Sequence, residues 1–133
     1  MLGKLIKFTD YNGVEREEKF YFNISKTELV EKQNEIDGGL QAKIERIIAA
    51  QNGPELMKLF REFVDLSYGE KSDDGKYFRK SPEILANFKS TTAYDALIME
   101  LLGDETGETV INFMKAIIPS DVADQIDLEK INM

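Results

Sequence analysis

The chain has 133 residues, of which 42% are hydrophobic and 32% charged, a composition typical of a soluble globular protein with a sizeable core. It holds no cysteine and no histidine, which excludes disulfides, thiolate zinc sites, thiol nucleophiles and the commonest general base. No apolar run approaches the ~20 residues of a membrane span, and the start MLGKLIKFTD lacks the pattern of a signal peptide. We therefore expect one domain over residues 1–133, no membrane contact and a cytoplasmic location.

The net charge of −8 is unevenly distributed along the chain. Residues 1–94 carry 16 acidic and 15 basic side chains, whereas residues 95–133 carry 9 acidic and 2 basic ones. An acidic block repels phosphate backbones, which argues against direct nucleic-acid binding. It serves either solubility, which is the simpler interpretation, or a basic protein partner.

Residues 1–24 have the pattern of a β-hairpin that turns at Asn12-Gly13. A two-residue turn would divide the apolar side chains between the two faces of the hairpin. A three-residue loop over residues 11–13, with Gly13 left-handed, gathers them on one face instead. That face then contains Leu2, Ile6, Phe8, Val14, Phe20 and Phe22. We therefore expect the three-residue, bulged turn.

Two signals predict that a helix begins after Ser25. Ser25 and Glu28 can form a capping box, and Ile24 with Leu29 can form a hydrophobic staple. The glycines of Asp37-Gly38-Gly39 end this helix, and Asn52-Gly53 ends the next one. The second helix is amphipathic, with an apolar stripe of Leu40, Ile44, Ile47 and Ile48.

Residues 54–68 form the most apolar helical segment of the sequence. Its polar residues recur on one narrow stripe, so we expect a helix that is buried over most of its circumference. Pro54 suits the first helical position, and Gly69 suits a left-handed residue that closes the helix. This helix is the expected centre of the domain.

A long connection from Glu70 to Ser81 follows, with a turn expected at Asp74-Gly75. Ser81-Pro82 restarts helix, and Thr92 with Asp95 suggests the cap of the next one. The last helix is capped by Asp104 or Thr106 and stopped by Pro119. Apolar stripes predict the buried faces of these three helices: Ile84, Leu85 and Phe88; Tyr94, Leu97, Ile98, Leu101 and Leu102; Val110, Phe113, Met114 and Ile117.

The expected fold class is therefore α+β and mostly helical. Residues 1–24 form the hairpin, and residues 25–118 form a helical body in which about five to six helices pack around the central one. Residues 119–133 are expected as an acidic tail or a short helix.

Catalytic, metal and cofactor motifs do not emerge from the sequence. Asp73-Asp74-Gly75 lacks the alternating ligands and the terminal Glu of a calcium loop, and no phosphate-binding loop is present. Adjacent carboxylates such as Glu17 and Glu18 lie in charge-rich segments. Neither would be buried more than the other, so their pKa values would not be separated as acid–base catalysis requires. We expect a non-enzymatic protein without metal or cofactor.

The connection after the central helix alternates charges around two aromatic residues, Tyr77 and Phe78. Such a loop is either a protein-binding surface or a loop that an aromatic side chain pins to the core. Its candidate contact residues are Glu70, Lys71, Lys76, Tyr77, Phe78, Arg79 and Lys80.

Three segments occur in a recognisable order: KFTDYNGVEREEKFYFNISKTEL, then ELMKLFREFVDLSYGEKSDDGKYFRKS, then TTAYDALIMELL with a helix that ends FMKAIIP. The most specific parts are NGVERE with FYFN, and LSYGEKSDDGKYF followed by Ser81. Over residues 4–119 the chain resembles the tail assembly chaperones of long-tailed bacteriophages and prophages of Gram-positive bacteria.

The resemblance implies a protein that binds the tape measure protein and keeps it soluble until tail tube protein polymerises around it. Such a chaperone acts in the host bacterial cytoplasm and is absent from the mature virion. A frameshift-extended form would engage the tail tube protein. Coating a long partner also suggests several copies and self-association.

An apolar groove for a helical partner would need side chains that the core leaves free. The candidates on the late helices are Met99, Ile111, Met114 and Ile118, whose alternative position is the core. A second functional hypothesis is an acidic interaction module or a phage-encoded inhibitor that mimics nucleic acid, suggested by the acidic block from Asp95 onward.

Overall fold

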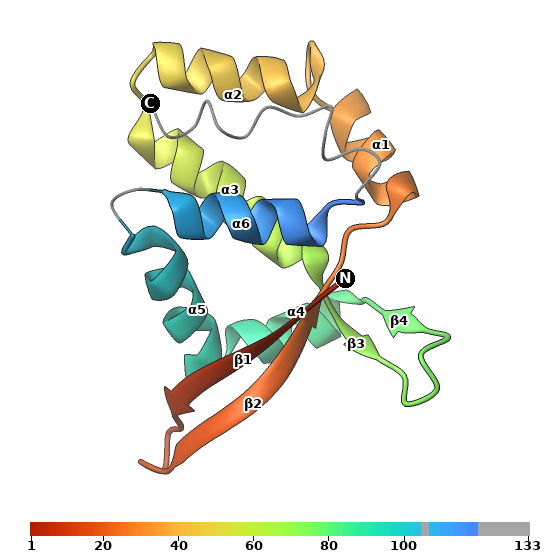
Figure 1. The fold of residues 1–133 in the computed structure, drawn as a ribbon, viewed down its shortest axis with the longest axis vertical. Helices are drawn as coiled ribbons and strands as arrows, with labels where there is room; N and C mark the ends of the chain where they lie inside the picture. The colour runs from red at the N-terminus through yellow and green to blue at the C-terminus, as the bar shows by residue number, and fades with distance from the viewer. Residues whose placement is uncertain (105–106, 120–133) are drawn as a thin grey trace.

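The structure is a computed structural model that describes residues 1–104 and 107–119 (Figure 1). Its elements follow in the order β1 (Leu2–Thr9), β2 (Glu15–Phe22), α1 (Lys26–Asn34), α2 (Gly39–Ala49), α3 (Gly53–Ser67), β3 (Tyr68–Lys71), β4 (Phe78–Arg79), α4 (Pro82–Lys89), α5 (Thr92–Leu102) and α6 (Glu108–Ile117). The α+β, mostly helical class is thereby confirmed. The predictions for the tail from residue 120 onward and for a cap at Thr106 lie outside the described residues.

The β1–β2 hairpin has the predicted register and the predicted turn. Leu2 pairs with Phe22 and Thr9 with Glu15, and residues 11–13 form the loop, with Gly13 at φ 79°. The Asp10 carboxylate stabilises this loop, because its Oδ1 accepts hydrogen bonds from the backbone N–H groups of residues 12 and 14 at 2.9 and 3.0 Å. The shared apolar face is buried at Ile6 and Phe22 but runs out into solvent at the turn, where Val14 is 51% exposed.

The strands continue beyond the predicted hairpin into an antiparallel sheet of order β1-β2-β3-β4. The prediction that Gly69 closes α3 in a left-handed conformation is wrong. The helix ends at Ser67, Tyr68 is extended with ψ 139°, and Gly69 pairs with Tyr21 of β2. The chain therefore turns directly from helix into strand, and the expected connection contains the small β3–β4 hairpin.

The first two helices begin and end as their local signals predict. Ser25 and Glu28 form the complete capping box of α1. Gly38 and Gly39 both have positive φ, 79° and 85°, which makes the break between α1 and α2. Ser81 caps α4 by accepting a hydrogen bond from the N–H of Ile84 at 3.1 Å.

The start of α5 differs from the prediction, because its N-cap is Thr91 and no side chain there caps the helix. Thr92 lies inside the helix and donates instead to the backbone oxygen of Thr9 at 2.7 Å, which ties α5 to β1. At α6 the N-cap position is Gly107, yet Asp104 supplies the capping oxygen, since its Oδ2 accepts from the Thr109 N–H at 3.0 Å. The apolar stripe of α6 is buried as predicted.

Helix α3 is buried along one face rather than around most of its circumference. Its buried residues are Leu59, Phe60, Phe63, Val64 and Ser67, which concentrate in the second half. Met57, in the first half of the helix, is 45% exposed. Figure 1 shows α1 and α2 at one end of the molecule and the β1–β2 turn at the other, with α3 and α6 between them. The apolar half of α3 thus reaches the core, while its first half borders solvent.

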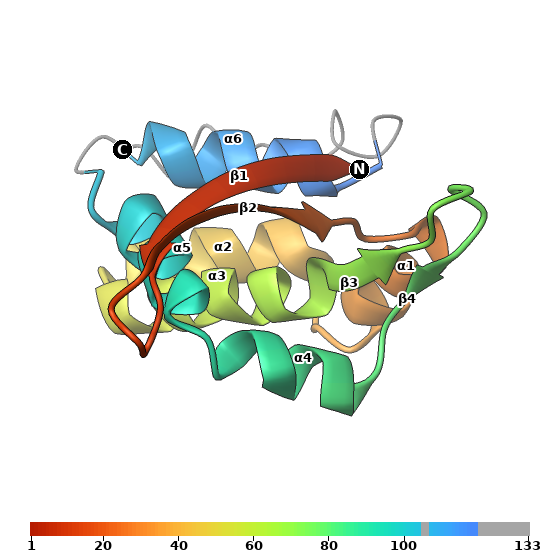
Figure 2. The same cartoon turned by 90° about the horizontal axis from the view of Figure 1, so that it is seen from below.

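An aromatic cluster joins the sheet to the late helices. Tyr68 of β3 stacks on Phe88 of α4 with ring centroids 4.0 Å apart, and Phe22 of β2 meets Phe113 of α6 edge-on at 5.3 Å. In the view of Figure 2 the β1–β2 hairpin arches over one side of the molecule and α4 lies on the opposite side. The aromatic rings therefore bridge segments that are far apart in sequence.

Candidate protein-binding surfaces

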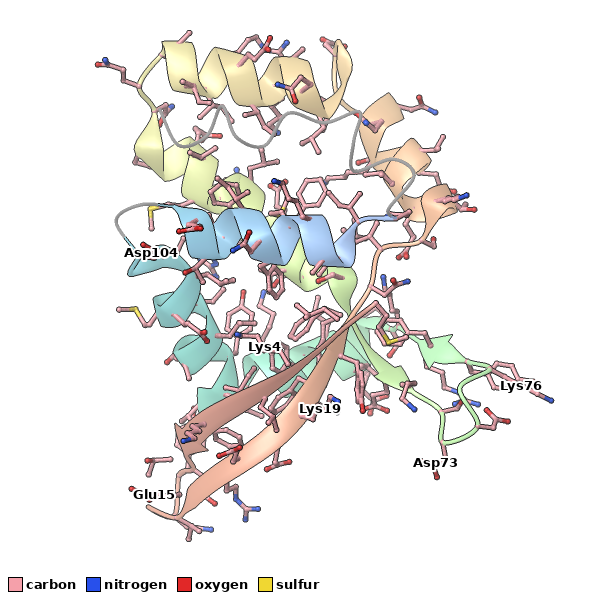
Figure 3. All side chains as sticks on the ribbon, in the orientation of Figure 1. Lys4, Glu15, Lys19, Asp73, Lys76 and Asp104 are labelled. Atoms are coloured by element: carbon pink, nitrogen blue, oxygen red, sulfur yellow. The ribbon has the colours of Figure 1, made fainter. Side chains whose placement is uncertain are left out.

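The β3–β4 hairpin holds most of the predicted contact residues and projects from the body (Figures 1 and 3). Its turn is well organised, because the Ser72 hydroxyl donates to Asp74 Oδ1 at 2.7 Å and accepts from the Tyr77 N–H at 3.0 Å. The hydrogen bond from Ser72 and that from the Lys76 N–H lower the pKa of Asp74. The expected turn at Asp74-Gly75 is confirmed, with Gly75 at φ 76°.

Exposed side chains at the end of this hairpin are open to a partner. Tyr77 is 56% exposed, and the Arg79 guanidinium lies over its ring at 4.9 Å. Lys76 is exposed at the tip, as Figure 3 shows. Phe78 instead lies against the backbone of Gly69, where a Cβ would come within 2.7 Å of its ring. Both interpretations of the loop thus apply, with Phe78 packed down and Tyr77 exposed.

Lys80 is placed differently from the rest of the predicted surface. Its Nζ donates to the backbone oxygens of Asn23 and Leu66, each at 2.6 Å, and to both carboxylate oxygens of Glu28 at 2.8 Å. It therefore joins the end of β2, the end of α3 and the capping box of α1. A side chain with these contacts is a structural tie, and at 23% exposure it stands apart from the exposed members of the predicted contact surface.

The same contacts change the pKa of the Glu28 carboxyl. Partial burial acts to raise the pKa of its carboxyl, but hydrogen bonds from Lys80 and from the Ser25 backbone outweigh burial and hold the pKa below its ordinary value. The ionised form is thus the one that the fold stabilises.

The four candidates on the late helices separate into two groups. Ile111, Met114 and Ile118 are only 1%, 1% and 4% exposed, so they belong to the core and do not line an exposed groove. Met99 on α5 is 70% exposed. The late helices therefore offer a partner the outer side of α5, and the predicted groove on α6 is not present in the described residues.

An open groove does exist, between α3 and α5. It has a volume of about 520 Å³, and its apolar lining comes from Pro54 and Met57 of α3 and from Ile98 and Leu102 of α5. Charged side chains of α3 complete the wall: Lys58, Arg61, Glu62 and Asp65. Met99, the next residue on α5 after Ile98, is 70% exposed but does not line the groove.

A polar network connects the two helices that form this groove. The Tyr94 hydroxyl of α5 donates to Asp65 Oδ1 of α3 at 2.8 Å, and Lys89 Nζ lies 3.4 Å from Asp65 Oδ2. Burial raises the pKa of Tyr94, and Asp65 acts in the same direction while Arg61 opposes it. The network ties the helices together, and within residues 1–104 and 107–119 the apolar floor stays open.

Sequence reasoning missed most of this groove. Ile98 and Leu102 belong to the stripe that the helical pattern assigns to the core, and the structure leaves them only partly buried. The apolar pattern of residues 54–68 likewise predicts Met57 within a buried helix. One feature of the sequence does indicate the groove. Helices α3 and α5 carry more apolar residues than a single buried face requires, so some of them must lie at the surface.

The described residues contain no group of three or more acidic side chains arranged to hold a metal ion, and no helix among them is long and apolar enough to cross a membrane.

Comparison with known proteins gives the class. A family model described as phage tail assembly chaperone matches residues 1–132. The chain therefore belongs to the phage tail assembly chaperone family. Searches of curated proteins and of solved structures return no significant match.

Proposed function

We propose that this chaperone binds the tape measure protein through the α3–α5 groove and keeps it soluble while the tail tube assembles. Membership of the family supports a role in tail assembly. The observation that carries the proposal is the apolar floor of Met57, Ile98 and Leu102, which the rest of the described residues leave open. A long helical protein exposes apolar stripes before it is enclosed, and such a stripe fits a groove between two helices.

The shape and chemistry of the groove support a helical occupant. Its floor is apolar and its α3 wall carries both signs of charge, from Lys58 and Arg61 to Glu62 and Asp65. An amphipathic helix buries its stripe on such a floor and places its polar flanks against the wall. The side chain of Met57 is flexible and polarisable, so it adapts to varied apolar partners.

The proposal places the protein in the host cytoplasm during assembly of a long-tailed phage or prophage of a Gram-positive bacterium, and outside the mature virion. The role is non-enzymatic. A long tape measure protein takes up several chaperone copies, and an extended form of the chain links the complex to tail tube protein.

Co-expression with the tape measure protein of the same phage tests this function. We expect the tape measure protein to remain in the soluble fraction and to co-purify with the chaperone. The matched control is expression of the tape measure protein alone, which should leave it largely insoluble. A tape measure protein that stays insoluble with the chaperone present, and that yields no complex, would contradict the proposal.

A further inference from the structure

The outer face of the sheet, which is turned away from the core, carries an unusual pair of lysines. Lys19 of β2 and Lys71 of β3 approach the same ring, that of Tyr21, with their Nζ atoms 5.7 and 5.5 Å from its centroid. Residues 19, 21 and 71 share this face because side chains alternate along paired strands and Tyr21 pairs with Gly69. Figure 3 shows Lys19 on β2.

The carboxylate that acts on this pair is that of Asp74, whose pKa is lowered by hydrogen bonds from Ser72 and the Lys76 N–H and, less strongly, by the charge of Lys71. Neither lysine forms an ion pair within the described residues, and Lys71 Nζ donates only to the backbone oxygen of Ser72 at 3.1 Å. The carboxylate next along β2 on the same face, Glu17, pairs with Lys7 at 3.8 Å. The chain holds 25 acidic residues against 17 basic ones, so acidic side chains are not scarce. Like charges on neighbouring strands repel, and the shared ring offsets this only in part.

The surface around the lysines is partly apolar. Leu5 pairs with Lys19 across the strands and is 60% exposed. Gly3 lies opposite Tyr21, and a Cβ on it would come within 2.5 Å of Lys19 Cε. The glycine thus makes room for the Lys19 stem, and the face combines two cations with exposed aliphatic and aromatic surface.

We propose that this outer face is a second binding surface, which takes an acidic segment of the tape measure protein. A carboxylate of that segment bridges the Lys19 and Lys71 ammonium groups, and an apolar side chain beside it packs on Leu5. Such a ligand relieves the repulsion between the lysines and covers the exposed leucine. The inference rests on the proposed function, since it names the same partner.

A polypeptide suits the face better than a nucleic acid does. The chain has a net charge of −8, which opposes the approach of a polyphosphate but leaves a single acidic segment free to reach a local cationic pair. The groove binds an apolar stripe of the partner and the outer face binds its carboxylates, so one long partner is held by two different kinds of contact.

The test measures the Kd of the full chain for the tape measure protein. We expect K19E/K71E to weaken binding at least tenfold at about 100 mM salt, with a much smaller effect at about 500 mM. The control K26E/K43E makes the same change in net charge on α1 and α2 and should bind as the wild type does. Thermal melting confirms that each variant is folded, and K19Q/K71Q replaces the reversal if K19E/K71E unfolds.

The outcomes separate this inference from the proposed function. If K19E/K71E binds normally while M57E in the groove binds weakly, the outer face is not a contact and the groove proposal stands. If the wild type does not bind at all, the proposed function fails and this inference fails with it. Loss of self-association or of duplex DNA binding in K19E/K71E, with the Kd for the tape measure protein unchanged, assigns the face to another ligand and overturns the inference.

Discussion

The Lys80 ammonium lies 2.8 Å from both carboxylate oxygens of Glu28, although 52 residues separate them in the chain. The same ammonium also donates hydrogen bonds to two backbone oxygens, each at 2.6 Å. A residue between β4 and α4 thereby holds the start of α1 against the ends of β2 and α3.

Replacing Lys80 should destabilise the whole fold. K80M keeps the length of the side chain but leaves the Glu28 carboxylate and two carbonyls without their donor, and we expect a loss of about 2 kcal/mol or more. Urea unfolding measures this loss. K76M removes a lysine that is exposed at the hairpin tip and should change stability by less than about 0.5 kcal/mol. Equal stability of the two variants would show that the Lys80 contacts contribute nothing.

Stability should also depend on pH through Glu28. Its pKa is lowered in the folded state, so the contribution is present above the pKa of the unfolded chain, about 4.3, and is lost as pH falls through the folded value. We expect E28Q to lose stability at neutral pH and to show a shallower further loss on acidification than the wild type. Parallel pH profiles for the two proteins would exclude Glu28 as a source of the acid sensitivity.

Gly69 should resist substitution for a steric reason. A Cβ at this position would lie 2.7 Å from the Phe78 ring and 2.8 Å from the backbone oxygen of Arg79, so β3 and β4 would have to separate. We expect G69A to cost about 1–3 kcal/mol. G53A is the matched control, because nothing lies within 4 Å of a Cβ there, and it should be neutral or slightly stabilising. Thermal melting of both variants decides the point.

Reversing the charges of Lys76 and Arg79, while Lys80 is kept, tests whether the hairpin tip is a contact surface. Both side chains are exposed, so K76E/R79E should melt as the wild type does. We expect weaker binding to the tape measure protein because the variant changes the charge beside the exposed Tyr77. Unchanged binding would restrict the hairpin to a structural role.

Local patterns predicted the features that depend on neighbouring residues. The register of the β1–β2 hairpin follows from the parity of its apolar positions, and the capping box of α1 follows from Ser25 and Glu28 alone. Strands β3 and β4 were missed because Tyr68-Gly69-Glu70-Lys71 has no apolar alternation. These residues become a strand only because β2 offers them a backbone partner.

The binding surfaces depend on contacts that no local pattern contains. Lys80 looked like any other lysine of a charged loop, because its partners lie on three distant segments. Ile111 and Met114 had the same helical spacing whether buried or exposed, and the groove arises from the spacing between α3 and α5. Met99 alone among the four apolar candidates lies at the surface.

The affinity of the M57E variant for the tape measure protein tests the central claim most directly. Met57 is 45% exposed on the groove floor, so a glutamate there should leave the fold intact and weaken binding at least tenfold, since a charge would face the apolar stripe of the partner. V30E makes the equivalent change at a 57% exposed residue on α1, away from the groove, and should bind normally. Equal affinities for M57E, V30E and the wild type would contradict the assignment of the groove as the binding site.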